Sequence, residues 1–102
     1  MIKLKKSKLT EIIQNLVYSR YSQLIINEYL KLKKIKVPVH LALGHELIAE
    51  SISQVMNKDD LLICSHRNIH YHLARGAQLK ELIDEYFLLK SGLGQGKCGS
   101  MN

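Results

Sequence analysis

Residues 7–33, SKLTEIIQNLVYSRYSQLIINEYLKLK, contain the longest regular pattern of apolar side chains in this sequence. Apolar residues recur there at intervals of three and four positions: Leu9, Ile12, Ile13, Leu16, Val17, Tyr21, Leu24, Ile25 and Tyr29. An α-helix brings residues at these intervals onto one face. The stretch therefore predicts one long amphipathic helix over residues 7–33.

Shorter elements are predicted downstream. Pro38 is the only proline, and because it lacks a backbone N–H it breaks the helical pattern. Apolar spacing then predicts three more helices, at 45–56, 69–74 and 79–90. Gly76 is placed to cap the second of them. The apolar run at 61–64 predicts one short buried strand. We therefore expect a mainly α-helical chain that forms a single incomplete domain over residues 1–102.

The composition is typical of a folded protein, since 46% of the residues are hydrophobic and 24% are charged. No apolar run approaches the roughly 20 residues that span a bilayer, and the start lacks the pattern of a secretory signal. Cys64 and Cys98 lie far apart and suggest no disulfide framework, so the sequence predicts a protein of the reducing cytoplasm.

The net charge of +6 is concentrated at one end of the chain. Residues 1–36 hold nine basic and two acidic side chains, a net charge of +7, whereas residues 37–102 have a net charge of −1. Such a basic helical region can bind nucleic acid or an anionic surface. Lysines that only solvate the ends of a helix are the favoured interpretation, because interleaved aromatic residues and arginines are sparse.

The polar cluster CSHRNIHYH at 64–72 begins at the last residue of the predicted strand and continues beyond it. Ligands bind at the carboxyl ends of strands in open α/β sheets. The guanidinium of Arg67 suits a pair of phosphate oxygens, and His66 adds a nitrogen donor beside it. The pair is a candidate diphosphate site.

A zinc site is the rival interpretation of this cluster, with Cys64, His66, His70 and His72 as possible ligands. Their spacing matches no closed zinc pattern, and we predict no metal ligands in the chain. His70 and His72 are instead expected on a helix surface without a ligand.

Two further groups of side chains have the chemistry needed for catalysis. His40 follows Pro38 and, on spacing alone, is more typical of a structural histidine. Glu46 and Glu50 lie four residues apart on what the pattern predicts is one exposed helix face, with Glu46 in the first turn, where it favours the helix dipole. An acid–base pair needs two distinct environments, so these carboxylates predict none.

Several motifs, taken in order, resemble those of one enzyme family. VHLALGHE at 39–46 is similar to the family's H-L-x-x-G-Q-E segment, and SHR at 65–67 is similar to its [TSA]-[HY]-R element, with ARG at 74–76 at the matching distance. GKCGSM at 96–101 is similar to its G-[KR]-x-G-S-M element. The family is the alpha subunit of the thiamine-diphosphate-dependent E1 components of the pyruvate, branched-chain 2-oxo acid and acetoin dehydrogenases, and the resemblance covers nearly the whole chain.

The resemblance implies a cofactor, partners and residue roles. The cofactor is thiamine diphosphate with Mg²⁺, and the partners are an E1 beta subunit and a lipoyl-bearing E2 component. The reaction is oxidative decarboxylation of a 2-oxo acid, with acyl transfer to the lipoyl domain. His66 and Arg67 would hold the diphosphate, His40 would lie in the substrate-side pocket, and the glycine-rich tail 92–102 would border the active site. The intact family fold is an α/β thiamine-diphosphate-binding fold, of which this chain resembles the N-terminal segment.

Departures from the family pattern keep two alternatives open. His45, Ile69 and Asn102 stand where glutamine, histidine and histidine are common. The chain is accordingly either an E1 alpha segment or a divergent thiamine-diphosphate subunit of another reaction type, with a non-enzymatic basic binding module as the third possibility.

The family's metal motif, G-D-G followed by N-N, is absent and is expected beyond residue 102. The activating glutamate of the family comes from the beta subunit. The 102-residue chain alone is therefore expected to be inactive and to bind no thiamine diphosphate. Calorimetry that detects tight, magnesium-dependent binding would contradict this expectation.

Overall fold

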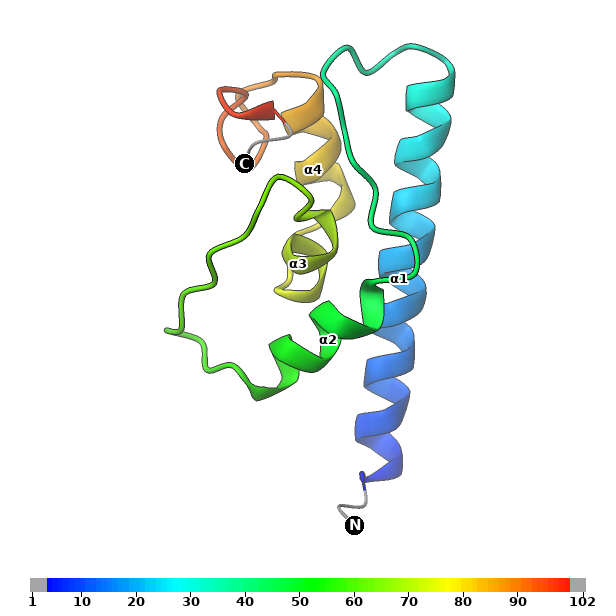
Figure 1. Ribbon diagram of the computed structural model, residues 1–102, viewed down its shortest axis with the longest axis vertical. Helices are drawn as coiled ribbons and strands as arrows, with labels where there is room; N and C mark the ends of the chain where they lie inside the picture. The colour runs from blue at the N-terminus through cyan, green and yellow to red at the C-terminus, as the bar shows by residue number, and fades with distance from the viewer. Residues whose placement is uncertain (1–3, 100–102) are drawn as a thin grey trace.

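The computed structural model describes residues 4–99, and four helices account for its regular structure. They are α1 (Lys6–Lys31), α2 (Glu46–Val55), α3 (Ile69–Ala74) and α4 (Leu79–Tyr86). In Figure 1 α1 runs along the whole length of the molecule, and the three shorter helices lie on one side of it. The prediction of a mainly helical chain with a long first helix is confirmed.

The buried face of α1 differs from the apolar stripe that defines its pattern. The buried residues of α1 are Ser19, Ser22, Gln23 and Ile26. Much of the stripe is exposed, at Leu9, Ile13, Val17, Tyr21, Leu24 and Ile25. Gln23 Oε1 accepts a hydrogen bond from Ala42 N of the following segment at 2.7 Å. Polar pairing, and not the apolar stripe, thus joins the middle of α1 to the rest of the fold.

The segment after α1 turns back along the helix, as Figure 1 shows. Helix α1 ends at Lys31, and two residues later Lys33 adopts a φ of 57°. Lys34 N then donates a hydrogen bond to Tyr29 O at 3.0 Å. Residues 34–45 form no helix, which agrees with the break predicted at Pro38. The segment contributes to a core shared with α1, α3 and α4, whose buried members are Ile26, Ile35, Ala42, Ile69, Leu73, Leu82 and Tyr86.

The strand predicted at 61–64 is wrong. Residues 61–64 have no regular structure and lie in a long connection between α2 and α3 that Figure 1 shows looping away from the helices. Leu61 and Ile63 are 92% and 97% exposed, so they are not buried either. A strand needs a neighbouring strand to satisfy its backbone groups, and residues 4–99 contain no strand that could pair with it.

The C-terminal helices follow the local signals more closely. Helix α3 begins and ends at the predicted residues, and Gly76 follows it with a φ of 104°, as expected for a helix C-terminus. Helix α4 begins at the predicted Leu79, where Glu81 Oε2 accepts from Gln78 N at 2.9 Å, but ends four residues early at Tyr86. None of the helices in the described part of the chain has the length and apolarity needed to cross a membrane.

Candidate functional site

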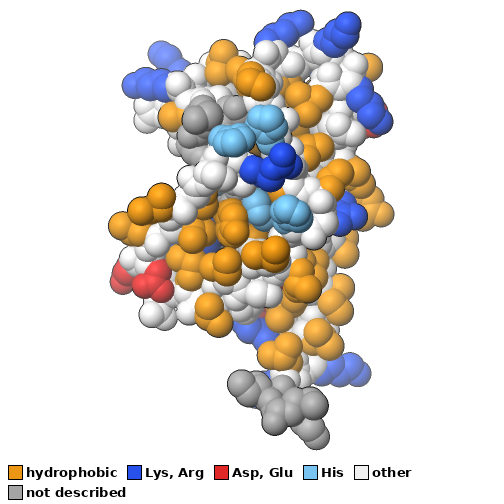
Figure 2. Space-filling view, viewed as in Figure 1, with side chains coloured by type: hydrophobic (Ala, Val, Ile, Leu, Met, Phe, Trp, Pro, Cys, Tyr) orange, Lys and Arg blue, Asp and Glu red, His pale blue; other side chains and the backbone are white. Residues whose placement is uncertain are grey.

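The structure brings His40 and His66 together although 26 positions separate them in the sequence. Their ring centroids lie 4.8 Å apart at an angle of 73°, an edge-to-face contact, and both side chains are exposed. His40 comes from the segment between α1 and α2, and His66 from the connection before α3. Figure 2 shows histidines gathered in two groups on one face, with a basic side chain between them.

Arg67 joins the same two segments. Its Nη1 donates a hydrogen bond to the carbonyl oxygen of Leu41, the neighbour of His40, and the side chain is exposed. The guanidinium has five N–H donors in a planar fork, and this bond orients the fork beside the histidine pair. The three residues that the sequence singled out therefore form one exposed cluster of cationic and nitrogen donors.

A buried carboxylate fixes the segment that carries His40. Glu46 Oε2 accepts from Arg20 Nε at 2.6 Å and from Gln23 Nε2 at 3.2 Å, and its Oε1 accepts from Arg20 Nη2 at 3.1 Å and from Gly44 N at 2.8 Å. Together with the bond from Ala42 N to Gln23, these contacts tie residues 42–46 to α1 at several points. Hydrogen bonds from Arg20 lower the pKa of Glu46 to about 2, against the effect of burial, which raises it.

The expectation of an exposed acidic face on α2 is therefore wrong. Glu46 and Glu50 are only 6% and 2% exposed. Glu50 Oε1 accepts from Asn15 Nδ2 at 2.9 Å and from Gln54 Nε2 at 2.7 Å. The two carboxylates face α1 because polar partners there satisfy them, and spacing within α2 alone contains no information about those partners.

Sequence reasoning missed Glu46 and Gln23 as residues that position the site. Glu46 was assigned only a favourable place near the helix dipole. A usable signal was present, since Arg20 and Gln23 interrupt the apolar pattern of α1 at two positions three residues apart, which an α-helix places on one face. A basic and an amide side chain on one helix face suit an acidic partner elsewhere in the chain.

His70 also differs from its prediction, because it is 4% exposed and not on the surface. Its ring lies 4.2 Å from that of Tyr71 and 6.2 Å from that of His45, measured between centroids. Within residues 4–99 no hydrogen-bond partner reaches its Nδ1. Burial, followed by the nearby His45, lowers the pKa of His70, so the neutral imidazole is favoured in the folded chain.

This lowered pKa predicts a loss of stability in mild acid. An unfolded chain protonates His70 near its ordinary pKa of 6.5, whereas the folded chain resists protonation. The stabilisation is thus fully present above pH 6.5 and declines as the pH falls below that value. We expect urea unfolding to give a lower free energy of unfolding at pH 5 than at pH 7.5, and we expect this difference to shrink in His70→Gln. An equal difference in both proteins would contradict the assignment to His70.

Metal-ligating side chains do not converge in the described part of the chain. Among residues 4–99 no group of three His, Cys, Asp or Glu is arranged to hold a metal ion. Cys64 and Cys98 are both free and exposed. Partial desolvation of the Cys64 thiol raises its pKa, which makes it a poorer metal ligand. The zinc interpretation of the 64–72 cluster gains no support.

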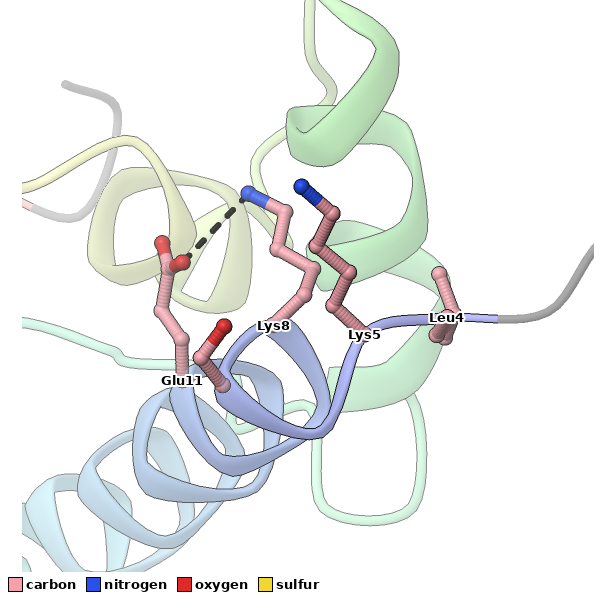
Figure 3. A pocket seen from close by; sticks show the side chains of 5 residues that line it. Leu4, Lys5, Lys8 and Glu11 are labelled. Atoms are coloured by element: carbon pink, nitrogen blue, oxygen red, sulfur yellow. Dashed lines mark hydrogen bonds and ion pairs between the residues drawn. The ribbon is translucent and has the colours of Figure 1, made fainter.

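A pocket of about 450 Å³ lies at the start of α1 and is shown in Figure 3. Its lining residues come from the first turns of α1 and the two residues before it, and are Leu4, Lys5, Ser7, Lys8 and Glu11. Lys8 Nζ and Glu11 Oε2 form an exposed ion pair there at 3.3 Å. None of the residues singled out for chemistry lines this pocket, so the candidate site remains the cluster around His40, His66 and Arg67.

Comparison with known proteins finds one kind of relative. The chain is 32% identical over 97 residues to the mitochondrial pyruvate dehydrogenase E1 component subunit alpha of Saccharomyces cerevisiae, a match that covers 95% of this chain and 23% of that protein. The corresponding subunit of Schizosaccharomyces pombe is 31% identical over 101 residues, covering 99% and 25%. The subunit of Dictyostelium discoideum is 35% identical over 72 residues, covering 71% and 19%.

The chain thus spans about a quarter of the length of the curated relatives that it matches along nearly its whole extent. No protein-family model matches it, and no solved structure matches it.

Proposed function

Because this chain belongs to the family of pyruvate dehydrogenase E1 component alpha subunits, we propose that it supplies the diphosphate-binding part of such a subunit. The reaction would be oxidative decarboxylation of a 2-oxo acid, with transfer of the acyl group to a lipoyl domain. The partners would be an E1 beta subunit and a lipoyl-bearing E2 component. Two free, exposed cysteines suit a reducing compartment, and we propose the cytoplasm.

One observation supports this proposal above the others, namely the convergence of His40, His66 and Arg67. The two rings are in contact at 4.8 Å, and Arg67 is bonded to the carbonyl of the residue after His40. An exposed guanidinium beside an imidazole offers charge-assisted donors to the oxygens of a diphosphate. His66 and Arg67 would hold that group, and His40 would face the substrate side of the cofactor.

The donor set of this cluster fits a diphosphate and does not fit the accompanying Mg²⁺. Magnesium prefers oxygen ligands, whereas the cluster consists of nitrogen donors, and residues 4–99 contain no group of side chains arranged for a metal ion. We therefore assign no magnesium ligand to the described residues. Thiamine diphosphate, when bound, supplies the carbanion chemistry of the decarboxylation. The residues of this chain bind and orient it.

Replacement of Arg67 by alanine tests the proposal in the full chain purified from its source with its bound subunits. The wild type is expected to decarboxylate pyruvate in a thiamine-diphosphate-dependent manner. A hydrogen bond to a charged group contributes roughly 1.5–3 kcal/mol, so Arg67→Ala should raise the half-saturating cofactor concentration at least about tenfold.

Arg75→Ala is the matched control, because Arg75 is also exposed but donates to the Asp60 carbonyl outside the cluster (3.2 Å). It should leave cofactor saturation unchanged. A wild-type assembly without decarboxylase activity would overturn the proposed function. Normal activity with unchanged cofactor saturation in Arg67→Ala would overturn only the role of Arg67.

A further inference from the structure

Glu85 is a buried carboxylate that no motif singled out. It lies near the end of α4 and is 0% exposed. Its two oxygens accept four hydrogen bonds from backbone N–H groups of the glycine-rich tail. Oε1 accepts from Gly94 N at 2.6 Å and Gly96 N at 2.9 Å, and Oε2 accepts from Cys98 N at 3.0 Å and Gly99 N at 2.9 Å.

This arrangement explains the composition of the tail. A carboxylate can receive four donors only if the backbone wraps closely around it, and side chains at every position would prevent that approach. Gly94, Gly96 and Gly99 provide three of the four donors. Burial raises the pKa of Glu85, but the four N–H bonds together lower it by more than burial raises it. The pKa therefore lies below its ordinary value, and the carboxylate stays charged.

Gly99, the last tail residue that the structure describes, lies near the segment that carries His40. The Cβ position of Gly99 lies 3.5 Å from Cγ1 of Val37, three residues before His40, and 3.7 Å from Cδ2 of Leu88. Gly99 is thus held by Glu85 and lies near the segment that carries His40. The position of Gly99 in the tail therefore depends on the side chain of Glu85, which lies outside the cluster of His40, His66 and Arg67.

We infer that Glu85 is a positioning residue that sets the glycine-rich tail beside the segment that carries His40, at Val37, and so shapes the substrate side of the site. The inference rests on the proposed function, because only a substrate at His40 gives the tail position a chemical consequence. Glu85 acts through the backbone N–H groups of the tail and does not itself touch substrate or cofactor.

Two measurements on the full chain test this inference separately from the proposed function. The first is amide hydrogen exchange by NMR, which needs neither ligand nor activity. In Glu85→Gln the side-chain amide replaces one acceptor oxygen with a donor, so protection at Gly94, Gly96, Cys98 and Gly99 should fall while protection in α1 and α2 is kept. Unchanged protection of these four amides would overturn the inference whatever the protein does.

The second measurement is steady-state decarboxylation of pyruvate by the full chain with its bound subunits. A displaced tail is expected to raise the KM for pyruvate about tenfold, while the half-saturating thiamine diphosphate concentration changes less than about twofold. Simple loss of folded protein lowers kcat and moves neither of these concentrations, so it is distinguishable. Glu28→Gln is the matched control, because Glu28 forms only an exposed pair with Lys31, and it should change nothing.

The outcomes are separable. Wild-type activity with an unchanged KM in Glu85→Gln overturns the positioning role and leaves the proposed function standing. Loss of amide protection in Glu85→Gln, together with a wild-type assembly that has no activity, overturns the proposed function and with it the consequence drawn for the substrate side. Loss of protection together with a raised KM for pyruvate supports both.

Discussion

Substitution of Glu46 by glutamine is expected to lower the free energy of unfolding by roughly 2–4 kcal/mol, because it removes the buried carboxylate of a hydrogen-bonded charge pair. Glu46 accepts four hydrogen bonds, from Arg20, Gln23 and Gly44, and is 6% exposed. The NH2 group of a glutamine would instead face some of these N–H groups and could not accept from them. Since Arg20 is half exposed, water compensates part of the loss, and the estimate lies below that for a fully buried pair.

Chemical denaturation of the variant and the wild type at pH 7 measures the effect. Glu28→Gln removes an exposed pair of the same type, with Lys31 at 3.2 Å, and should cost less than about 1 kcal/mol. The pKa of Glu46 adds an independent check. Its stabilisation is present above the ordinary value of 4.5 and is lost as the pH falls towards about 2. Similar unfolding free energies for Glu46→Gln and Glu28→Gln would show that the network contributes little.

Substitution of Gly96 by alanine is expected to destabilise the chain by about 2–5 kcal/mol through two effects that add. Gly96 has a φ of 78°, where an L-residue costs roughly 1–2 kcal/mol. An added Cβ would also lie 2.5 Å from the carbonyl oxygen of Leu88, and forcing a methyl group into a packed site costs roughly 1–3 kcal/mol. Because the obstructing atoms are backbone, no side-chain rotation relieves the clash.

Gly76→Ala separates the two effects. Gly76 has a φ of 104° but no atom within 4 Å of its Cβ position, so only the conformational cost applies there. Thermal or urea unfolding should place Gly76→Ala roughly 1–2 kcal/mol below the wild type and Gly96→Ala lower still. If the two variants are equally stable, the tail does not pack against Leu88 as described.

The helices could be predicted because neighbours in sequence determine them. Helix α3 matched at both ends, and α2 (Glu46–Val55) begins and ends within one residue of the predicted range 45–56. The strand at 61–64 failed because an apolar run does not specify whether a partner strand exists. The buried face of α1 was not predicted for a similar reason. Apolar spacing predicts which side chains share a face, but the position of Arg20 and Gln23 relative to Glu46 decides which face is buried.

The residues of the candidate site could be proposed from the sequence, but the contacts that hold them in place could not. His66 and Arg67 stood out as adjacent donors, and the resemblance added His40, but no spacing rule predicts the 4.8 Å contact between rings 26 positions apart. Glu85 was missed because its role depends on donors nine to fourteen residues later in the chain. The glycines at 94, 96 and 99 were the available signal, because the backbone N–H groups of such a run need acceptors when they are buried.

The reversed faces of α1 have a consequence for how this helix tolerates sequence change. In an ordinary amphipathic helix, drift is fastest at polar positions and slowest at leucine and isoleucine. Here Ser19, Ser22 and Gln23 are buried, whereas Leu9, Ile13 and Val17 are exposed. For the chain taken by itself, the small and polar positions of α1 are therefore the constrained ones. A mutational scan of α1 is expected to find strong selection at these serine and glutamine positions as well as at the fully buried Ile26. A hydrophobicity profile of the same helix would rank the serine and glutamine positions as the most dispensable.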